Sequence, residues 1–296
     1  MKRNLIINFH VVNDPEWFER VILLLRSKYS LVELSFFENI DNYKKKKGFC
    51  HITFDDGDKT FYTVAYPILK KHNVPATIFV SPKIIMEHVN FWFQEVRGYD
   101  KNVMNAIFAK ELSLPLAKIS KTGFINILKR LPVTHINKFI ELYRKETNTP
   151  LKPFQNMNLV QILEVEKSGL VTIGAHTLNH PILKNENNEV CYREITESII
   201  GLQELIGRKI KYFAYPNGIP NKDFGDREIE IVRKSNILIA VSGEQKFISK
   251  DDNLLAFPRI GISYGSMRFI RLKLTMGTKW GILKKLFIKI RKILYD

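Results

Sequence analysis

Cysteine, long apolar runs and acidic residues are all scarce in this chain, and each shortage excludes a class of protein. The two cysteines among 296 residues are Cys50 and Cys191, so no disulfide framework is predicted. No apolar run reaches the roughly 20 residues that a membrane-spanning helix needs. The apolar stretch after Arg3 is interrupted by Asn8 and His10, which makes it too short for a signal sequence and typical of a first strand. We therefore expect a cytoplasmic protein.

The shortage of acid leaves the chain basic, and the excess gathers at one end. Lys and Arg number 46 against 30 Asp and Glu, a net charge of +16. Apolar side chains recur near the C-terminus at helical spacing: Trp280, Leu283, Leu286, Phe287, Ile290 and Leu294. We expect residues 266–296 to form a basic amphipathic extension that contacts an anionic membrane peripherally, at its inner face. The alternative is an ordinary helix packed on the main domain.

A basic chain could also bind nucleic acid, since positive charge is the electrostatic footprint of such proteins. The sequence contains no helix-turn-helix, zinc-finger or RNA-recognition pattern. A general basic patch also does not explain the histidine and aspartate motifs described below. We therefore expect no nucleic-acid partner.

Apolar strand-like runs alternate with helical patterns along most of the chain, which predicts a parallel sheet or barrel with outer helices in one domain, residues 1–265. The strand-like runs are residues 5–12, 48–54, 75–80, 171–175, 210–214, 237–241 and 254–260. The alternation stops between Trp92 and Leu159, where residues 101–112, 122–131 and 134–146 favour helices. We expect a helical insertion at about residues 97–157, which is either a lid over the substrate or structural padding.

Two adjacent carboxylates follow the second of the long strand-like runs. Residues 50–54 are apolar enough for a buried strand, and Asp55, Asp56 and Gly57 come directly after it. Adjacent side chains on an extended backbone point apart, so one aspartate can bind a metal while the other acts as a base. An alternative is that Asp56 or Asp58 caps the helix predicted at residues 59–71, which would explain one carboxylate but not both.

Two histidines follow the run 171–175 in the same way. His176 and His180 are separated by three residues, a spacing that brings two imidazoles together on a helix or a tight turn. Neutral imidazole is the commonest ligand for zinc and similar ions, although single histidines are often satisfied polar residues. Together with Asp55 and Asp56, the pair suggests a mononuclear metal hydrolase.

These residues resemble the motifs of the polysaccharide deacetylases, the NodB-homology or carbohydrate esterase 4 family. Residues 53–57 (Thr-Phe-Asp-Asp-Gly) resemble the first motif, and His176, Thr177 and His180 the second. Residues 213–218 (Phe-Ala-Tyr-Pro-Asn-Gly) are similar to the third, which lines the groove in this family. The resemblance spans about residues 4–262, and it implies a distorted (β/α) barrel that is often seven-stranded.

The resemblance implies a role for each motif residue. Asp56, His176 and His180 would bind one divalent metal ion, zinc in the first instance with cobalt or nickel as alternatives. Asp55 would be the general base. The backbone N–H of Tyr215 would help the metal stabilise the oxyanion. Pro216, the next residue, would line the groove.

The chain departs from the family pattern at two positions. Many members carry the acid histidine near the C-terminal end, but residues 255–260 contain Arg259 instead. The position of His10 on the first strand resembles the permuted arrangement of the poly-N-acetylglucosamine deacetylases, in which the acid histidine lies on that strand. We therefore take His10 as the acid. The alternative is that His10 only forms a hydrogen bond at the strand end. Many members place an arginine just before the proline of the third motif, and Ala214 occupies that neighbourhood here. Arg259 could supply that cation to Asp55, or it could be a surface residue.

The resemblance therefore predicts a metal-dependent hydrolase that removes N-acetyl groups from an amino sugar during synthesis of a surface glycan. Its partner would be an N-acetylated sugar or glycan intermediate. An O-acetyl esterase remains an alternative because the same water attack cleaves esters. A non-catalytic carbohydrate-binding relative is the other alternative.

Overall fold

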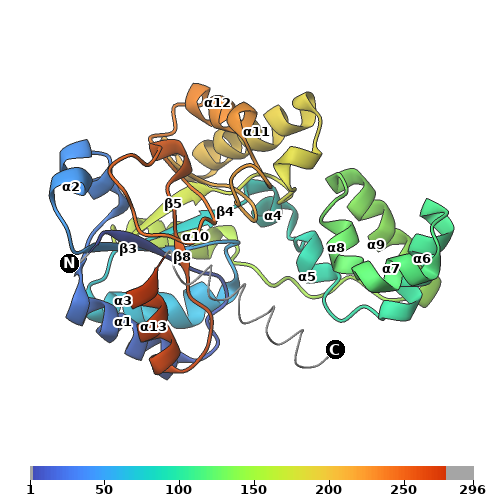
Figure 1. Cartoon of the computed structure of the whole chain (residues 1–296), viewed down its shortest axis with the longest axis horizontal. Helices are drawn as coiled ribbons and strands as arrows, with labels where there is room; N and C mark the ends of the chain where they lie inside the picture. The colour runs from blue at the N-terminus through green and yellow to red at the C-terminus, as the bar shows by residue number, and fades with distance from the viewer. Residues whose placement is uncertain (1–2, 278–296) are drawn as a thin grey trace.

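A curled parallel β-sheet forms the centre of the molecule in a computed structural model that describes residues 3–277 (Figure 1). The described residues form an eight-stranded sheet in the order β7-β6-β5-β4-β3-β1-β8, and β2 pairs with β3 off this path. All of its ladders are parallel. The strands are β1 (Leu5–Phe9), β2 (Ser30–Leu31), β3 (Phe49–Phe54), β4 (Ala76–Val80), β5 (Val171–Ala175), β6 (Tyr212–Ala214), β7 (Ile239–Val241) and β8 (Ile260–Gly261).

The segment before β8 connects the two strands at the ends of the order, β7 and β8. Phe257 forms a parallel bridge with Val241 of β7, whereas Ile260 pairs with Ile7 of β1. Pro258 lies between these two pairings and has no backbone N–H with which to continue a ladder. The sheet therefore curls into the distorted (β/α) barrel that the resemblance implied. The predicted strand 254–260 is wrong in its first half, which forms the short helix η4 (Leu254–Ala256).

Helices surround the barrel, as the alternating pattern predicted. In α1, Asp14 accepts a hydrogen bond from the backbone N–H of Trp17, and Pro15 begins the helix with a suitable backbone angle. The buried face of α1 joins the main core beneath the sheet. The other helices outside the insertion are α2 (Ile40–Lys45), α3 (Tyr66–His72), α4 (Pro82–Glu87), α10 (Leu159–Lys167), α11 (Asn188–Ile206), α12 (Asp226–Lys234) and α13 (Met267–Met276), and α1 spans Pro15–Lys28.

The helix predicted at residues 59–71 is confirmed but irregular. Its first part is a wider π-type turn, η2 (Phe61–Ala65), which continues directly into α3. Pro67 lies at the junction and cannot donate its backbone nitrogen to the preceding turn. The missing hydrogen bond accounts for the irregular turn.

Five helices project from one side of the barrel and have a hydrophobic core of their own (Figure 1). They are α5 (Trp92–Glu95), α6 (Lys101–Leu112), α7 (Leu116–Thr122), α8 (Phe124–Leu128) and α9 (Val133–Thr147). The predicted helix 101–112 coincides with α6. The predicted helix 122–131 is split, because Gly123 has a φ of 77° between α7 and α8.

The first part of the predicted C-terminal extension is the helix α13, which packs on the barrel. Its buried side chains Ile270 and Leu274 belong to the main core. The predicted amphipathic stripe from Trp280 onward lies outside the described residues, and its contact with a membrane stays a prediction. Among residues 3–277, no helix is both long and apolar enough to cross a membrane.

Candidate active site

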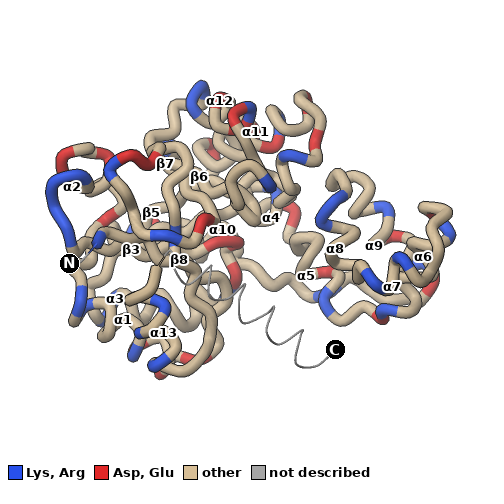
Figure 2. The backbone as a smooth tube through the Cα atoms, in the orientation of Figure 1, with Lys and Arg blue, Asp and Glu red and all other residues tan. Residues whose placement is uncertain are grey.

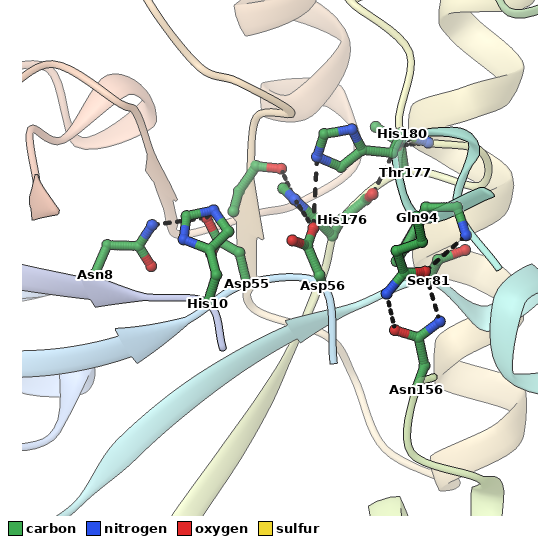
Figure 3. A network of polar contacts seen from close by, with 12 residues as sticks. Asn8, His10, Asp55, Asp56, Ser81, Gln94, Asn156, His176, Thr177 and His180 are labelled. Carbon is green, nitrogen blue, oxygen red and sulfur yellow. Dashed lines mark hydrogen bonds and ion pairs between the residues drawn. The ribbon is translucent and has the colours of Figure 1, made fainter. Parts of the chain in front are cut away.

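The side chains predicted to be functional gather at one end of the barrel (Figure 3). Asp55 and Asp56 follow β3, His10 follows β1, and His176 follows β5. Because the strands are parallel, their carboxyl ends form one edge of the sheet, which is where α/β barrels place their chemistry. Strand ends distant in sequence therefore form one site.

A tight turn separates the two aspartates. The backbone N–H of Asp55 donates to Phe9 O at 3.0 Å and so continues the ladder with β1. The next residues leave the strand conformation, with φ of 71° at Asp56 and 72° at Gly57. A Cβ atom on Gly57 would lie 2.9 Å from Cγ1 of Val80, so a glycine is needed there for space as well as for conformation.

The helix-capping role suggested for this motif belongs to Asp58. Its Oδ1 accepts hydrogen bonds from the backbone N–H of Thr60 at 2.8 Å and from Thr60 Oγ1 at 2.6 Å. Capping therefore requires neither Asp55 nor Asp56, and both carboxylates are available for other roles.

Asp56, His176 and His180 form a cluster of possible metal ligands. Asp56 Oδ1 lies 3.5 Å from Nε2 of each histidine, and the three candidate ligand atoms lie within 4.8 Å of one another. All three residues are buried, and Asp56 Oδ1 has no hydrogen-bond partner. Such an oxygen is costly to bury unless something binds it. One carboxylate and two imidazoles are a donor set that zinc accepts, so these residues fit a divalent ion.

The surroundings of the two histidines favour metal binding. Nδ1 of His176 lies 2.7 Å from Ala214 O, an acceptor that holds the proton on Nδ1 and leaves Nε2 as a lone-pair donor. Burial lowers the pKa of His180 to about 3, which keeps this imidazole neutral. The His180 ring also packs against Phe91 and Phe93, with ring centroids 5.5 and 4.8 Å away.

A turn, and not a helix, brings the two imidazoles together. Thr177 and His180 both have positive φ, 61° and 55°, and the His180 backbone N–H donates to Thr177 Oγ1. Glu194 on α11 supports the turn, because its Oε2 accepts from the backbone N–H groups of Leu178 and Asn179 at 3.0 and 2.9 Å. Sequence analysis missed Glu194, which shows only as one acid in a long helix.

Asp55 has a different set of partners. Arg259 donates to both of its carboxylate oxygens, at 2.7 and 2.8 Å, and Asn8 Nδ2 donates to Oδ2 at 3.0 Å. Arg259 is only 2% exposed, which excludes the surface alternative. Burial alone would raise the pKa of Asp55, but Arg259 and then His176 outweigh it and hold that pKa below its usual range. Asp55 is therefore an ionised carboxylate outside the ligand cluster.

His10 lies beside Asp55 at the mouth of the site. Its Nε2 is 3.8 Å from Asp55 Oδ2, and its side chain is 55% exposed. This position leaves the imidazole open to solvent and to a bound substrate. It is compatible with the predicted role as an acid, which stays a prediction.

The third motif begins on β6 and continues into the loop after it, next to β7. The backbone N–H of Tyr215 donates to Val241 O at 3.2 Å, so the sheet uses the group that the resemblance assigned to the oxyanion. Pro216 is buried, and its carbonyl accepts from Gly218 in a tight turn. The residue of this loop that lines the active-site pocket is Asn217. The predicted oxyanion role of the Tyr215 N–H and of Pro216 stays a prediction.

A cavity of about 560 Å³ opens between the ligand cluster and the helical insertion. It has the size that proteins commonly use for small ligands. His10, Asp56, His180 and Asn217 line it from the barrel. The insertion and the residues leading into it contribute Trp92, Phe93, Val96, Arg97, Gly98, Tyr99, Lys101, Phe124, Ile125 and Lys129. The insertion therefore forms one wall of the site.

Fold and site together define a parallel-stranded (β/α) barrel with an Asp-His-His cluster and a second aspartate at the carboxyl ends of its strands. The model of the polysaccharide deacetylase family matches residues 42–234, which is more than half of the chain. The chain belongs to this family.

Named enzymes from two Staphylococcus species are similar to the chain. Poly-beta-1,6-N-acetyl-D-glucosamine N-deacetylase of Staphylococcus aureus is 29% identical over 227 residues, which are 75% of this chain and 58% of the relative. The enzyme of that name from Staphylococcus epidermidis is 24% identical over 225 residues, with the same coverage. The chain thus spans little more than half the length of these relatives.

Solved structures agree on the fold. IcaB from Ammonifex degensii superposes with a TM-score of 0.64 at 18% identity, covering 93% of this chain and 97% of that one. The de-N-acetylase from Aggregatibacter actinomycetemcomitans gives a TM-score of 0.59 at 18% identity, with 92% and 100% coverage. At such low identity the likeness concerns the fold alone.

Proposed function

We propose that this protein is a metal-dependent hydrolase that removes the acetyl group from an N-acetylated amino sugar. The observation that carries the proposal is that the two adjacent aspartates have different surroundings. Asp56 faces His176 and His180 as a ligand would, whereas Asp55 is held as a carboxylate by Arg259. A metal hydrolase needs this combination of a metal site and a separate base.

The chemistry can be assigned to named groups. A divalent ion bound by Asp56, His176 and His180 would supply Lewis-acid polarisation of the acetyl carbonyl and acidify the attacking water. Asp55 takes a proton from that water while the water oxygen forms a bond to the carbonyl carbon. The C–N bond then breaks, and His10 gives a proton to the leaving nitrogen, so that acetate and a free amine are released. Asn217 of the third motif lines the cavity, and we infer that it contacts the substrate.

The relatives support a glycan as the substrate class. The Staphylococcus enzymes are named for N-deacetylation of poly-beta-1,6-N-acetyl-D-glucosamine, and the third-motif loop and the insertion shape a cavity beside the ligand cluster. We infer that the substrate is an N-acetylated sugar within, or destined for, a surface polysaccharide. Zinc is the ion that the donor set favours, with cobalt or nickel as substitutes.

Acetate release tests the proposal. Metal-stripped protein should release no acetate from N-acetylglucosamine oligomers, and protein reloaded with zinc or cobalt should release it. An O-acetylated oligomer tests the esterase alternative in parallel. Zinc binding without acetate release from either substrate would favour a non-catalytic carbohydrate-binding relative and contradict the proposal.

A further inference from the structure

The wall that the insertion contributes to the active-site cavity is basic. Arg97, Lys101 and Lys129 line the cavity, and the only acid that lines it among the described residues is Asp56, which belongs to the ligand cluster. Figure 2 shows Lys and Arg positions on the tube next to α5, α7 and α8. In the described part of the chain, Arg97 and Lys101 form no ion pair with an acid, and both are exposed. Their charges are therefore available to a ligand.

One of these cations, Lys129, is held in place by contacts between the insertion and the barrel. Lys129 Nζ donates to Asn217 Oδ1 at 3.0 Å, and Asn185 Nδ2 donates to Lys129 O at 3.0 Å. The backbone N–H of Val133 donates to Glu186 Oε1 at 2.7 Å. These bonds join the end of α8 and the start of α9 to loops of the barrel. Lys129 is thus positioned beside the third motif and is not a freely moving surface lysine.

Unpartnered polar groups on both sides of the cavity point to a ligand rich in acceptors. The hydroxyl of Tyr99 and the Nδ2 of Asn217 are buried without a hydrogen-bond partner in the structure, and both residues line the cavity. Tyr99 is 7% exposed, and its ring stacks on Tyr143 with centroids 3.8 Å apart. The cavity therefore has unpartnered hydrogen-bond donors beside it as well as the positive charge of the insertion. Neutral sugars offer hydroxyls, but anionic oxygens satisfy donors and cations at once.

We propose that the substrate carries an anionic oxygen group, phosphoryl or carboxylate, next to its N-acetylated sugar, and that Arg97, Lys101 and Lys129 bind this group. The inference rests on the proposed deacetylase function and refines its substrate class. It separates this chain from relatives named for a polymer of N-acetylglucosamine alone, because their named substrate carries no such group. The anion would lie on the insertion side of the cavity, while the acetyl group lies at the ligand cluster.

The test measures the activity of zinc-loaded protein on three matched substrates. The neutral substrate is a short N-acetylglucosamine oligomer, the phosphoryl substrate is the same oligomer with a 1-phosphate, and the carboxylate substrate carries a neighbouring uronic acid. We expect kcat/KM to be higher for at least one anionic substrate than for the neutral one. Comparing the phosphate with the uronic acid distinguishes the two sources of negative charge.

Charge-removing variants show whether the insertion is responsible. The double variant Arg97→Gln/Lys101→Gln should lower kcat/KM for the preferred anionic substrate by about tenfold and leave the neutral substrate nearly unchanged. Arg130→Gln is the matched control, since Arg130 is an exposed cation of the same segment that does not line the cavity. Lys129 is kept because it also holds Asn217.

The outcomes separate the two proposals. Equal kcat/KM on neutral and anionic substrates, unaffected by the double variant, would overturn the anionic-substrate inference and leave the deacetylase intact. A drop of equal size in Arg130→Gln would also overturn it, since the effect would then come from net charge. No acetate release from any of the three substrates would contradict the proposed function, and the inference would fall with it.

Discussion

Arg259 connects the proposed base to a segment of the chain that is about 200 residues away. It comes from the segment that closes the barrel, and it donates two hydrogen bonds to the carboxylate of Asp55 while Nε donates to Ser242 O at 3.0 Å. Its guanidinium also lies 5.7 Å from the ring centre of Phe79. One side chain thus joins the proposed base to the seam of the barrel.

Replacing Arg259 should therefore affect stability as well as activity. Arg259→Met leaves a buried carboxylate without its cation, and we expect a loss of about 3–5 kcal/mol in the free energy of unfolding. Urea denaturation measures this loss. The double variant Asp55→Asn/Arg259→Met is the control, since it removes the unpaired charge and should recover much of the stability. Unchanged stability in Arg259→Met would show that the pair contributes nothing to the fold.

The sequence predicts the site residues that directly follow a strand. It predicts poorly those whose role depends on partners distant in the sequence. Asp55, Asp56, His176 and His180 follow strand-like runs directly, so reading the strands was enough to place them together. Asn8 and Glu194 carry no such signal, because their importance lies in partners that are 47 and 15 or 16 residues away. The pairing of β1 with β3 decides the first contact, and the packing of α11 against the turn at residues 177–180 decides the second; sequence pattern alone shows neither.

At the scale of elements, the turn at residues 177–180 depends on α11. Glu194 accepts two backbone hydrogen bonds from this turn and a third from Asn179 Nδ2. Glu194→Ala should therefore loosen the position of His180 and weaken zinc affinity by about 10- to 100-fold. Competition with a chelating dye measures the affinity. Glu197→Ala, on the same helix, is the control, and equal affinities in the two variants would show that Glu194 does not position the ligand.

Strand β3 also carries a buried histidine, His51, away from the ligand cluster. Nδ1 of His51 lies 2.7 Å from Val32 O, and Nε2 lies 2.9 Å from Thr77 Oγ1 on β4. Burial lowers the pKa of His51 from 6.5 to about 4, although the hydrogen bond to Val32 opposes this shift. The unfolded chain therefore binds this proton at a higher pH than the folded chain.

Stability should consequently fall as the pH decreases between about 6.5 and 4, where the unfolded state gains the proton first. His51 alone accounts for about 3 kcal/mol over this window, since each pKa unit corresponds to about 1.4 kcal/mol. Denaturation at several pH values should show a shallower slope for His51→Gln than for the unaltered protein. His135→Gln, on the exposed surface of α9, is the control. An unchanged slope in His51→Gln would contradict the assignment.

Element boundaries were predicted well where side-chain periodicity decides them and poorly where proline or glycine does. The strand at residues 171–175 coincides with β5, and the helix at residues 101–112 coincides with α6. Pro67, Gly123 and Pro258 each altered a predicted element. Their effects depend on which neighbouring backbone group loses a partner, and that is a property of the folded chain.

At the scale of the whole molecule, the barrel supplies the reactive groups and the insertion supplies the opposite wall. The two parts have separate hydrophobic cores but meet at the cavity. The indole Nε1 of Trp92 also donates to His180 O at 3.0 Å, so the start of the insertion touches the ligand turn itself. This contact favours the interpretation of the insertion as part of the site over structural padding.

The measurement that tests the account most directly is zinc content and acetate release in Asp55→Asn and His176→Ala, side by side. We predict that Asp55→Asn binds one zinc ion per chain and releases acetate about a thousandfold more slowly, because only the base is lost. His176→Ala should lose both zinc and activity. An active Asp55→Asn, or full zinc binding in His176→Ala, would contradict the division of roles between the two aspartates and the histidines.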